Sequence, residues 1–265
     1  MSERRSMGSG LGATMLAMFL VASCSNGEPE PIGTSPTDAV ESSPTAGVES
    51  PASDVSILDD CPELPCEGPL EPGKYRWTFS EPEIDFEIPS PGWSWLYAGG
   101  GLHLIADETP PPQHQSLFVP DGIYFLHDPT IASQDCEESS EPGVGESVSD
   151  LVGWLETAPG LLVSEPTRVT VGGLDGTHLD FEIDPEWKRP CPFSEKLPAV
   201  PLIFNGAAPL GGYHWAIVPG QSMRWYILDS ENGVIIVNLE DDPGGLPHNE
   251  LLANAADIVA SLVIS

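Results

Sequence analysis

The folded part of this chain is constrained most by short runs of alternating polar and apolar residues that end at turn residues. Residues 83–88 alternate strictly, with Ile84, Phe86 and Ile88 on one side, and Pro89 follows them. Successive side chains of a strand point to opposite faces, and proline cannot donate a hydrogen bond to a sheet. This run therefore predicts a strand with one buried face that ends at Pro89.

About ten short strands of this kind are expected, because runs rich in β-branched and aromatic residues alternate with turn residues. Glycine-containing segments separate many of them, at residues 99–101, 120–122, 172–173, 175–176, 220 and 232–233. Tight turns of this kind join antiparallel neighbours. The last three runs are predicted to form a meander, in which each strand pairs with the next: residues 213–218, 223–228 and 234–239.

Two segments have helical spacing. In the first, Ser147 provides an N-cap and Asp150 a first-turn acid for a short amphipathic helix that stops at residues 159–160. In the second, Asn249 is the expected N-cap of a helix with one apolar face, made of Leu251, Leu252, Ala255, Ile258, Val259 and Leu262. The predicted fold class is α+β, mainly antiparallel β-sheet with two packed helices. The pattern does not give the strand order.

The N-terminus has the order of segments that is typical of a secretory signal. Residues 4–5 are arginines, residues 11–21 form an apolar run, and residues 22–23 are small. A transmembrane anchor or a buried helix is the alternative, but the run is shorter than the roughly 20 residues that span a bilayer. Residues 21–24, Val-Ala-Ser-Cys, resemble the lipobox of bacterial lipoproteins.

This resemblance implies that residues 1–23 are a lipoprotein signal peptide and that Cys24 carries the lipid, including fatty acids such as palmitate. A plain cleaved signal remains the alternative, and the two arginines leave a twin-arginine export route open. A lipidated cysteine with at least two acyl chains would be retained stably at the membrane. The expected location is the extracytoplasmic face of the cell membrane.

Residues 24–58 are rich in Ser, Pro and Glu and carry few large apolar side chains. Such a segment cannot bury enough surface to offset its chain entropy, so we expect a disordered tether. As a flexible coil it would span roughly 30–35 Å. Residues 59–265 are then expected to form a single globular domain.

The chain is strongly acidic, with 41 Asp and Glu against 9 Lys and Arg and a formal charge of −32. Loss of Glu3, Arg4 and Arg5 with the signal would make this charge more negative by one. Such a surface repels phosphate backbones and anionic lipid headgroups. Nucleic acid is therefore excluded as a partner. Because the acids are spread along the chain, they are expected to form a solvated surface.

Four cysteines follow Cys24, and an even number in an exported chain favours two disulfides. Cys61 and Cys66 lie close together in sequence, which favours a local pair and leaves Cys136 to pair with Cys191. The other pairings remain open. A zinc site is disfavoured, because the spacing matches no two-pair zinc pattern.

No catalytic residue, metal ligand or cofactor is predicted. The six histidines form no local metal motif, and the chain has no Gly-x-Ser-x-Gly, Walker or dinucleotide-binding pattern. His178 and Asp180 would share one strand face, an arrangement that a hydrolase could use but that is more often solvated sheet surface.

Two further patterns have functional and structural explanations. Residues 238–245 gather acids before a glycine turn but lack the alternating ligands of a calcium loop, so exposed turn surface is expected. Trp93, Trp95 and Tyr97 alternate on one strand and could stack on sugars, although buried aromatic residues in a sheet are the favoured explanation.

Residues 70–265 resemble exported actinobacterial lipoproteins without an assigned activity, and the order of elements is similar to the PsbP/Mog1-type sandwich of some mycobacterial lipoproteins. The resemblance depends on turn and core positions, in residues 70–75, 86–93, 169–176, 224–233 and 258–262. It implies a binding or assembly module and transfers no functional residue.

The sequence therefore predicts a membrane-anchored, non-enzymatic lipoprotein. Its expected partners are the lipid bilayer, through Cys24, and an envelope protein, polymer or small-molecule ligand. An envelope-acting hydrolase that uses surface histidine and carboxylate side chains is the alternative, and a purely structural envelope protein is a third.

Overall fold

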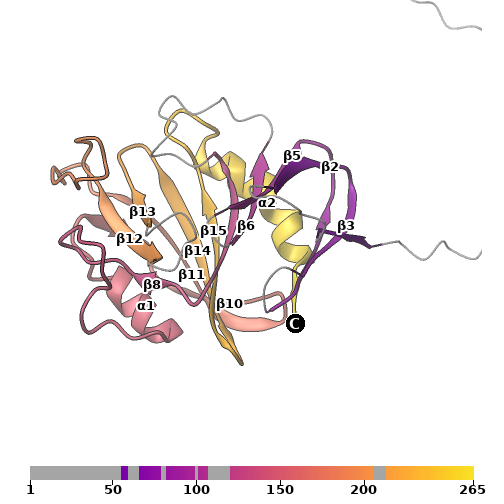
Figure 1. Ribbon diagram of the computed structural model, residues 1–265, viewed down its shortest axis with the longest axis horizontal. Helices are drawn as coiled ribbons and strands as arrows, with labels where there is room; N and C mark the ends of the chain where they lie inside the picture. The colour runs from indigo at the N-terminus through magenta and orange to yellow at the C-terminus, as the bar shows by residue number, and fades with distance from the viewer. Residues whose placement is uncertain (1–54, 59–65, 79–81, 99–100, 107–119, 206–212) are drawn as a thin grey trace, which may run out of the picture. The chain divides into compact units, whose positions relative to one another are not determined.

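The computed structural model describes residues 55–58, 66–78, 82–98, 101–106, 120–205 and 213–265 (Figure 1). Within these residues it contains two helices and sixteen strands in three sheets. All described strand pairs are antiparallel except β1 with β3. The chain is thus mostly antiparallel β-sheet with two helices, as the α+β prediction states.

The largest sheet has nine strands. Its order is β10-β11-β14-β15-β7-β6-β5-β2, with β9 also pairing with β11. Their bounds are β2 Cys66–Leu70, β5 Trp93–Ala98, β6 Gly101–Ala106, β7 Gly122–His127, β9 Leu161–Val163, β10 Thr167–Val171, β11 Leu174–Ile183, β14 Ser222–Ser230 and β15 Gly233–Glu240.

Two smaller sheets lie against it. One has the order β1-β3-β4-β16 and the other the order β13-β12-β8. The bounds are β1 Ser56–Ile57, β3 Gly73–Trp77, β4 Ile84–Ile88, β8 Thr130–Ile131, β12 Val200–Asn205, β13 Tyr213–Ile217 and β16 Val263–Ile264, and the helices are α1 Val148–Leu155 and α2 His248–Ser261. Residues 55–58, at the end of the expected tether, are therefore part of the fold.

The nine-stranded sheet is buried on both faces in its centre. Along β7, Ile123 and Phe125 belong to one core cluster, and Tyr124 and Leu126 belong to the other. The first cluster joins the sheet to α2 and the β4-containing sheet, and the second joins it to α1 and the β12-containing sheet. Figure 1 shows the two helices on opposite sides of the large sheet.

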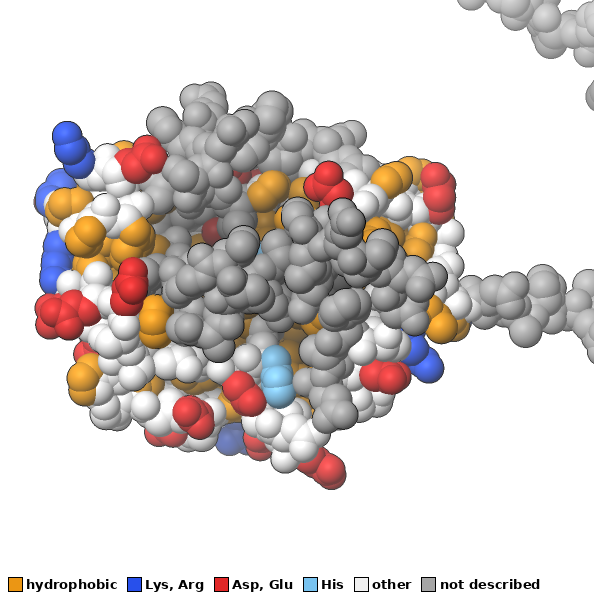
Figure 2. Space-filling model, in the orientation of Figure 1, with side chains coloured by type: hydrophobic (Ala, Val, Ile, Leu, Met, Phe, Trp, Pro, Cys, Tyr) orange, Lys and Arg blue, Asp and Glu red, His pale blue; other side chains and the backbone are white. Residues whose placement is uncertain are grey.

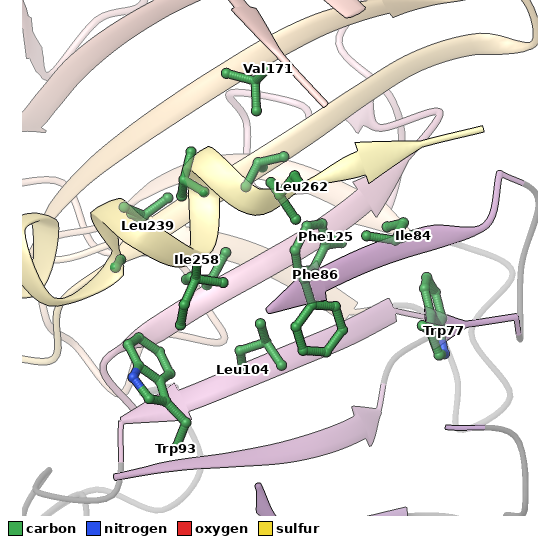
Figure 3. Close-up of a cluster of buried hydrophobic side chains, with 14 of the residues drawn as sticks. Trp77, Ile84, Phe86, Trp93, Leu104, Phe125, Val171, Leu239, Ile258 and Leu262 are labelled. Atoms are coloured by element: carbon green, nitrogen blue, oxygen red, sulfur yellow. The ribbon is translucent and has the colours of Figure 1, made fainter. Parts of the chain in front are cut away.

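The first core is closed by α2. Ile258 and Leu262 point toward Phe86 of β4 and toward Leu104 and Phe125 of the large sheet (Figure 3). The three residues of β4 predicted to face inward are all buried, and the exposed fraction of Phe86 is 2%. Complete burial of a side chain of this size contributes about 1.5–3 kcal/mol to stability.

The start of α1 is as predicted. Ser147 accepts a hydrogen bond from the Asp150 amide, and the Asp150 carboxylate accepts one from the Ser147 amide, which completes a capping box. The start of α2 differs from the prediction. This helix begins at His248 after Pro247, two residues before the expected position, and no side chain caps it. Proline suits a helix start because its missing N–H would have had no partner there.

The predicted three-strand meander is wrong at its first connection. β14 and β15 form the expected hairpin, with Ser230 opposite Gly233. However, β13 pairs with β12 in a separate sheet. The reason is that β14 has β11 on one side and β15 on the other, so neither edge is available to β13.

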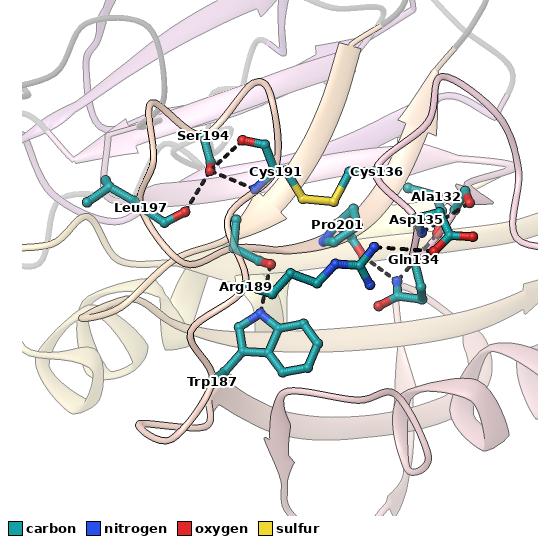
Figure 4. Close-up of a disulfide and its surroundings, with 12 residues drawn as sticks. Ala132, Gln134, Asp135, Cys136, Trp187, Arg189, Cys191, Ser194, Leu197 and Pro201 are labelled. Atoms are coloured by element: carbon teal, nitrogen blue, oxygen red, sulfur yellow. Dashed lines mark hydrogen bonds and ion pairs between the residues drawn. A yellow bond between two sulfur atoms is a disulfide. The ribbon is translucent and has the colours of Figure 1, made fainter.

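A disulfide joins Cys136 to Cys191, as predicted for this pair, across 55 positions of the sequence (Figure 4). Beside it, the Ser194 hydroxyl donates to the carbonyl oxygens of Cys191 and Leu197 and accepts from the Cys191 amide. Cys24 and Cys61 lie outside the described residues, and so does the side chain of Cys66. The Cys61–Cys66 pair therefore stays a prediction.

Neither α1 nor α2, the helices found in the described residues, has the length and apolar character needed to cross a membrane.

Candidate binding site

His178 and Asp180 lie on one face of β11, opposite the buried Leu179 and Phe181, as the alternation predicts. The structure gives them different neighbours. The His178 ring meets Tyr226, with 5.6 Å between ring centroids. The Asp180 carboxylate receives both Arg224 donors, Nε at 2.6 Å and Nη2 at 2.8 Å. Because both carboxylate oxygens accept from Arg224, Asp180 is held in place by β14.

A second histidine, which the sequence did not associate with Asp180, completes this cluster. His248, the first residue of α2, places Nε2 4.0 Å from Asp180 Oδ1 and Nδ1 3.7 Å from Asp241 Oδ2. Both ring nitrogens are buried without a hydrogen-bond partner among the described residues. The imidazole therefore lies between two carboxylates that come from distant parts of the chain.

The pKa values of these two acids shift in opposite directions. Burial alone would raise the pKa of Asp180, but the hydrogen bonds from Arg224 and the positive charges of Arg224 and nearby His248 hold it well below its usual value. Burial raises the pKa of Asp241 to about 6, against the opposing effects of the Ser222 amide and His248. Asp180 is therefore ionised at neutral pH, whereas Asp241 titrates near it.

A shallow groove of about 360 Å³ opens beside His248. Its lining comprises the polar residues Ser164, Asp180, Glu182, Ser222 and His248 and the apolar residues Leu162, Val163 and Phe181. Leu162 is 45% exposed, which is unusual for a large apolar side chain in this domain. Leu162 lies directly opposite Glu182 in the pairing of β9 with β11, so exposed apolar surface and a carboxylate lie side by side in the groove. This combination suits a ligand with a cationic or hydroxyl group on an apolar body.

The acidic run at residues 238–245 is not the exposed turn that the sequence predicts. Glu240, Asp241 and Asp242 are 1%, 5% and 7% exposed. Asp121, which is fully buried, accepts from the amides of Asp242 and Leu246 at 2.6 and 2.7 Å. The run is buried because Asp121 holds the end of β15 against the start of β7.

Glu240 has three side-chain donors. Trp215 Nε1 and Asn238 Nδ2 donate to Oε2 at 2.6 and 2.9 Å, and Gln221 Nε2 donates to Oε1 at 3.0 Å. Burial nevertheless raises the pKa of Glu240 to about 8, against these hydrogen bonds and with the help of the neighbouring Asp241 and Asp242. The folded domain therefore holds a carboxyl group that gains a proton near neutral pH.

Aromatic rings pack around this carboxyl group. Tyr124 lies with its ring centroid 4.7 Å from that of His103 and 5.0 Å from that of Trp215. His103 is 6% exposed, and burial lowers its pKa to about 4, so its imidazole is neutral at physiological pH. These rings join β6, β7 and β13, and their sequence positions give no sign of this contact.

The Trp93, Trp95 and Tyr97 stripe is largely explained by packing. Trp93 is 4% exposed, and Trp95 packs against the same core cluster. The Tyr97 side chain lies outside what the structure describes. The two tryptophans therefore stabilise the layer next to α2 and do not form an open platform for sugars.

In the described part of the chain, no three His, Cys, Asp or Glu side chains are placed to share a metal ion. Among the described side chains on the face seen in Figure 2, acidic ones are scattered and are interrupted by hydrophobic and uncharged ones. This distribution agrees with the expected solvated surface.

No protein-family model and no curated protein matches the chain. Among solved structures, the chain is similar to LpqN of Mycobacterium tuberculosis, whose structure is described as that of a protein involved in cell envelope biogenesis. The similarity covers 77% of this chain and 92% of that chain, at 13% identity and a TM-score of 0.34.

Proposed function

We propose that this protein is an extracytoplasmic lipoprotein that is anchored to the cell membrane through Cys24 and binds an envelope ligand without converting it. The lipobox of residues 21–24 supports the anchor. The arrangement of His248 is the observation that favours binding over catalysis. The groove beside His248 is the proposed ligand site.

A hydrolase of the nucleophile–base type needs a hydroxyl or thiol within hydrogen-bond reach of a base, and the base must have a nitrogen free to accept its proton. Among the described residues, no hydroxyl or thiol is hydrogen-bonded to either ring nitrogen of His248, whose nearest charged groups are two carboxylates at 3.7 and 4.0 Å. The hydroxyl of Ser164, in the same groove, accepts from the Asp180 amide at 2.9 Å. The described part of the groove therefore pairs no nucleophile with His248.

The ligand that fits the groove carries a cationic or hydroxyl group. Glu182 is an exposed carboxylate that lines the groove, and Asp180 beside it stays ionised because its pKa is lowered. Leu162, directly opposite Glu182 in the pairing of β9 with β11, offers exposed apolar surface next to it. An envelope protein, polymer or small molecule with such a group on an apolar body would contact the carboxylates and Leu162 at once.

Replacement of Cys24 with alanine is expected to move the protein from the membrane fraction to the soluble extracytoplasmic fraction, because the acyl chains would be lost. Intact-mass analysis of the wild-type protein should show the added lipid. Ser25→Ala is the matched control, since it alters the neighbouring residue and keeps the thiol. Unchanged partitioning of C24A, or a wild-type mass without fatty acids, would exclude the proposed anchor.

Reversal of the charge at the groove is expected to reduce ligand capture. In cells treated with a cross-linker, Glu182→Lys should lower the yield of groove-specific adducts by about tenfold, the loss that goes with about 1.4 kcal/mol of binding free energy. Glu186→Lys, at an exposed position not among the groove residues, should give wild-type adducts. Equal losses in both variants would contradict the groove assignment.

The hydrolase alternative has its own measurement. Purified protein is incubated with peptidoglycan, ester and glycoside substrates, and the released products are quantified. The proposal expects no turnover. Turnover that disappears in His248→Gln would replace the binding function with catalysis.

A further inference from the structure

A second and larger groove lies at the opposite end of β11 from Asp180. Its volume is about 540 Å³, within the range of small-molecule sites. Its lining comprises Val148, Arg168, Val169, Thr170, Asp175, Gly176, Thr177 and Asp229. None of these residues belongs to the groove beside His248.

The hairpin of β10 and β11 supplies most of the polar groups. Arg168 lies opposite Thr177, and Thr170 lies opposite Asp175. Residues directly opposite in an antiparallel pair point to the same face. The two-residue turn at Gly172 and Gly173, with φ of 64° and 87°, fixes this register, since both positions need the left-handed conformation that glycine adopts freely.

Arg168 is an unpaired cation in a strongly acidic chain. Three other arginines each pair with an aspartate: Arg76 with Asp85 at 2.6 Å, Arg189 with Asp135 at 3.2 Å and Arg224 with Asp180 at 2.6 Å. Arg168 makes no ion pair with any residue that the structure describes, although Asp175 and Asp229 line the same groove. Its guanidinium is therefore free to meet an anionic group.

The acids on the groove wall are also available. Asp229 is exposed on β14 and forms no ion pair with the described residues. Asp175 uses Oδ1 to accept from the Thr170 hydroxyl at 2.8 Å. The amides at the start of α1, which begins at Val148, are not a competing anion site, because Ser147 and Asp150 form the capping box there.

We propose that this groove binds a small zwitterion. The anionic group of the ligand pairs with Arg168, and its ammonium group pairs with Asp229 and Asp175, while the hydroxyls of Thr170 and Thr177 bind polar atoms between them. A simple anion would be repelled by the two carboxylates. A simple cation would leave Arg168 without a counter-charge. Only a ligand with both charges satisfies both sides of the groove.

The test uses a series of unbranched amino acids in which the ammonium and carboxylate groups are separated by one to seven carbon atoms. Binding to the whole chain in detergent is measured by calorimetry and by amide chemical shifts. We expect saturable binding in the millimolar range, with an optimum at one chain length and with shifts concentrated on β10 and β11. Alkyl amines and alkyl carboxylates of the same length should bind about tenfold or more weakly, because each lacks one charge-assisted contact.

Two variants and a control separate this site from general charge effects. Arg168→Gln and Asp229→Asn should each weaken the preferred amino acid by about tenfold or more. Arg189→Gln removes an exposed arginine that is not a groove residue and should bind like the wild type. No saturable binding for any chain length, binding that survives R168Q, or equal weakening by R189Q would overturn the proposal. The site is independent of the function proposed above, since these variants should leave adducts at the His248 groove unchanged.

Discussion

Replacing both Cys136 and Cys191 with alanine is expected to lower the free energy of unfolding by about 4 kcal/mol. The bond closes a loop across 55 sequence positions, and cross-links that close loops of this length restrict the unfolded chain by about that amount. The loop contains α1, β9, β10 and β11. Without the bond, the segment that carries these elements gains conformational freedom in the unfolded chain. Many residues of the second core come from this segment.

Denaturant unfolding followed by tryptophan fluorescence measures this loss. Reduction of the wild-type protein should lower the midpoint by at least as much as the double replacement does. The matched control is Cys61→Ala with Cys66→Ala, since any bond between these cysteines would close a much shorter loop and contribute less. An unchanged midpoint in C136A/C191A would show that the bond does not contribute to stability. A larger loss in the control pair would show that the N-terminal cysteines matter more.

The stability of the domain is expected to fall as the pH rises from about 4.5 to about 8, because of Glu240. Burial raises the pKa of Glu240 from 4.5 to about 8, so the folded state keeps a proton that the unfolded state releases. The contribution of Glu240 is complete below pH 4.5 and is lost as the pH passes through about 8. Each pH unit between these values costs up to about 1.4 kcal/mol, for a total of order 4 kcal/mol.

Glu240→Gln should remove this pH dependence. The glutamine side chain stays neutral at every pH. Its NH2 group is a donor and would face one of the three donors that Glu240 accepts from, which lowers the free energy of unfolding by a roughly constant 1–2 kcal/mol. The free energy of unfolding of E240Q, measured from pH 4.5 to 8, should therefore vary less than that of the wild type. Asp241 still titrates in both proteins, so only the difference between the two curves is informative. Glu186→Gln, at an exposed site, should follow the wild type, and parallel curves for E240Q and wild type would exclude the assignment.

Local patterns in the sequence predicted several elements. The strict alternation around Phe86 gave a strand with the correct buried face, and the serine and aspartate at residues 147 and 150 gave the start of α1. The Gly172–Gly173 turn and the β14–β15 hairpin were also predicted. Each of these features depends on residues that are close in sequence, which is why periodicity and turn chemistry are sufficient to predict them.

The features that the sequence did not reveal depend on distant partners. Along the chain, Glu240 and Asp241 look like exposed acids, and only the arrival of Trp215, Gln221 and Asp121 buries them. Similarly, His248 approaches Asp180 only because α2 starts beside β11. β13 could be assigned as a strand but not to its sheet, because the occupancy of both edges of β14 is a property of the whole fold.

The pairing of β1 with β3 determines where tension enters the domain. β1 contributes only Ser56 and Ile57 to this parallel pair, and the Leu58 amide adds one hydrogen bond to the Arg76 carbonyl. Any pull on the chain before residue 55 reaches this short contact first. It would therefore separate before the longer antiparallel ladders, and the pull would next act on the buried Leu58 of the first core cluster.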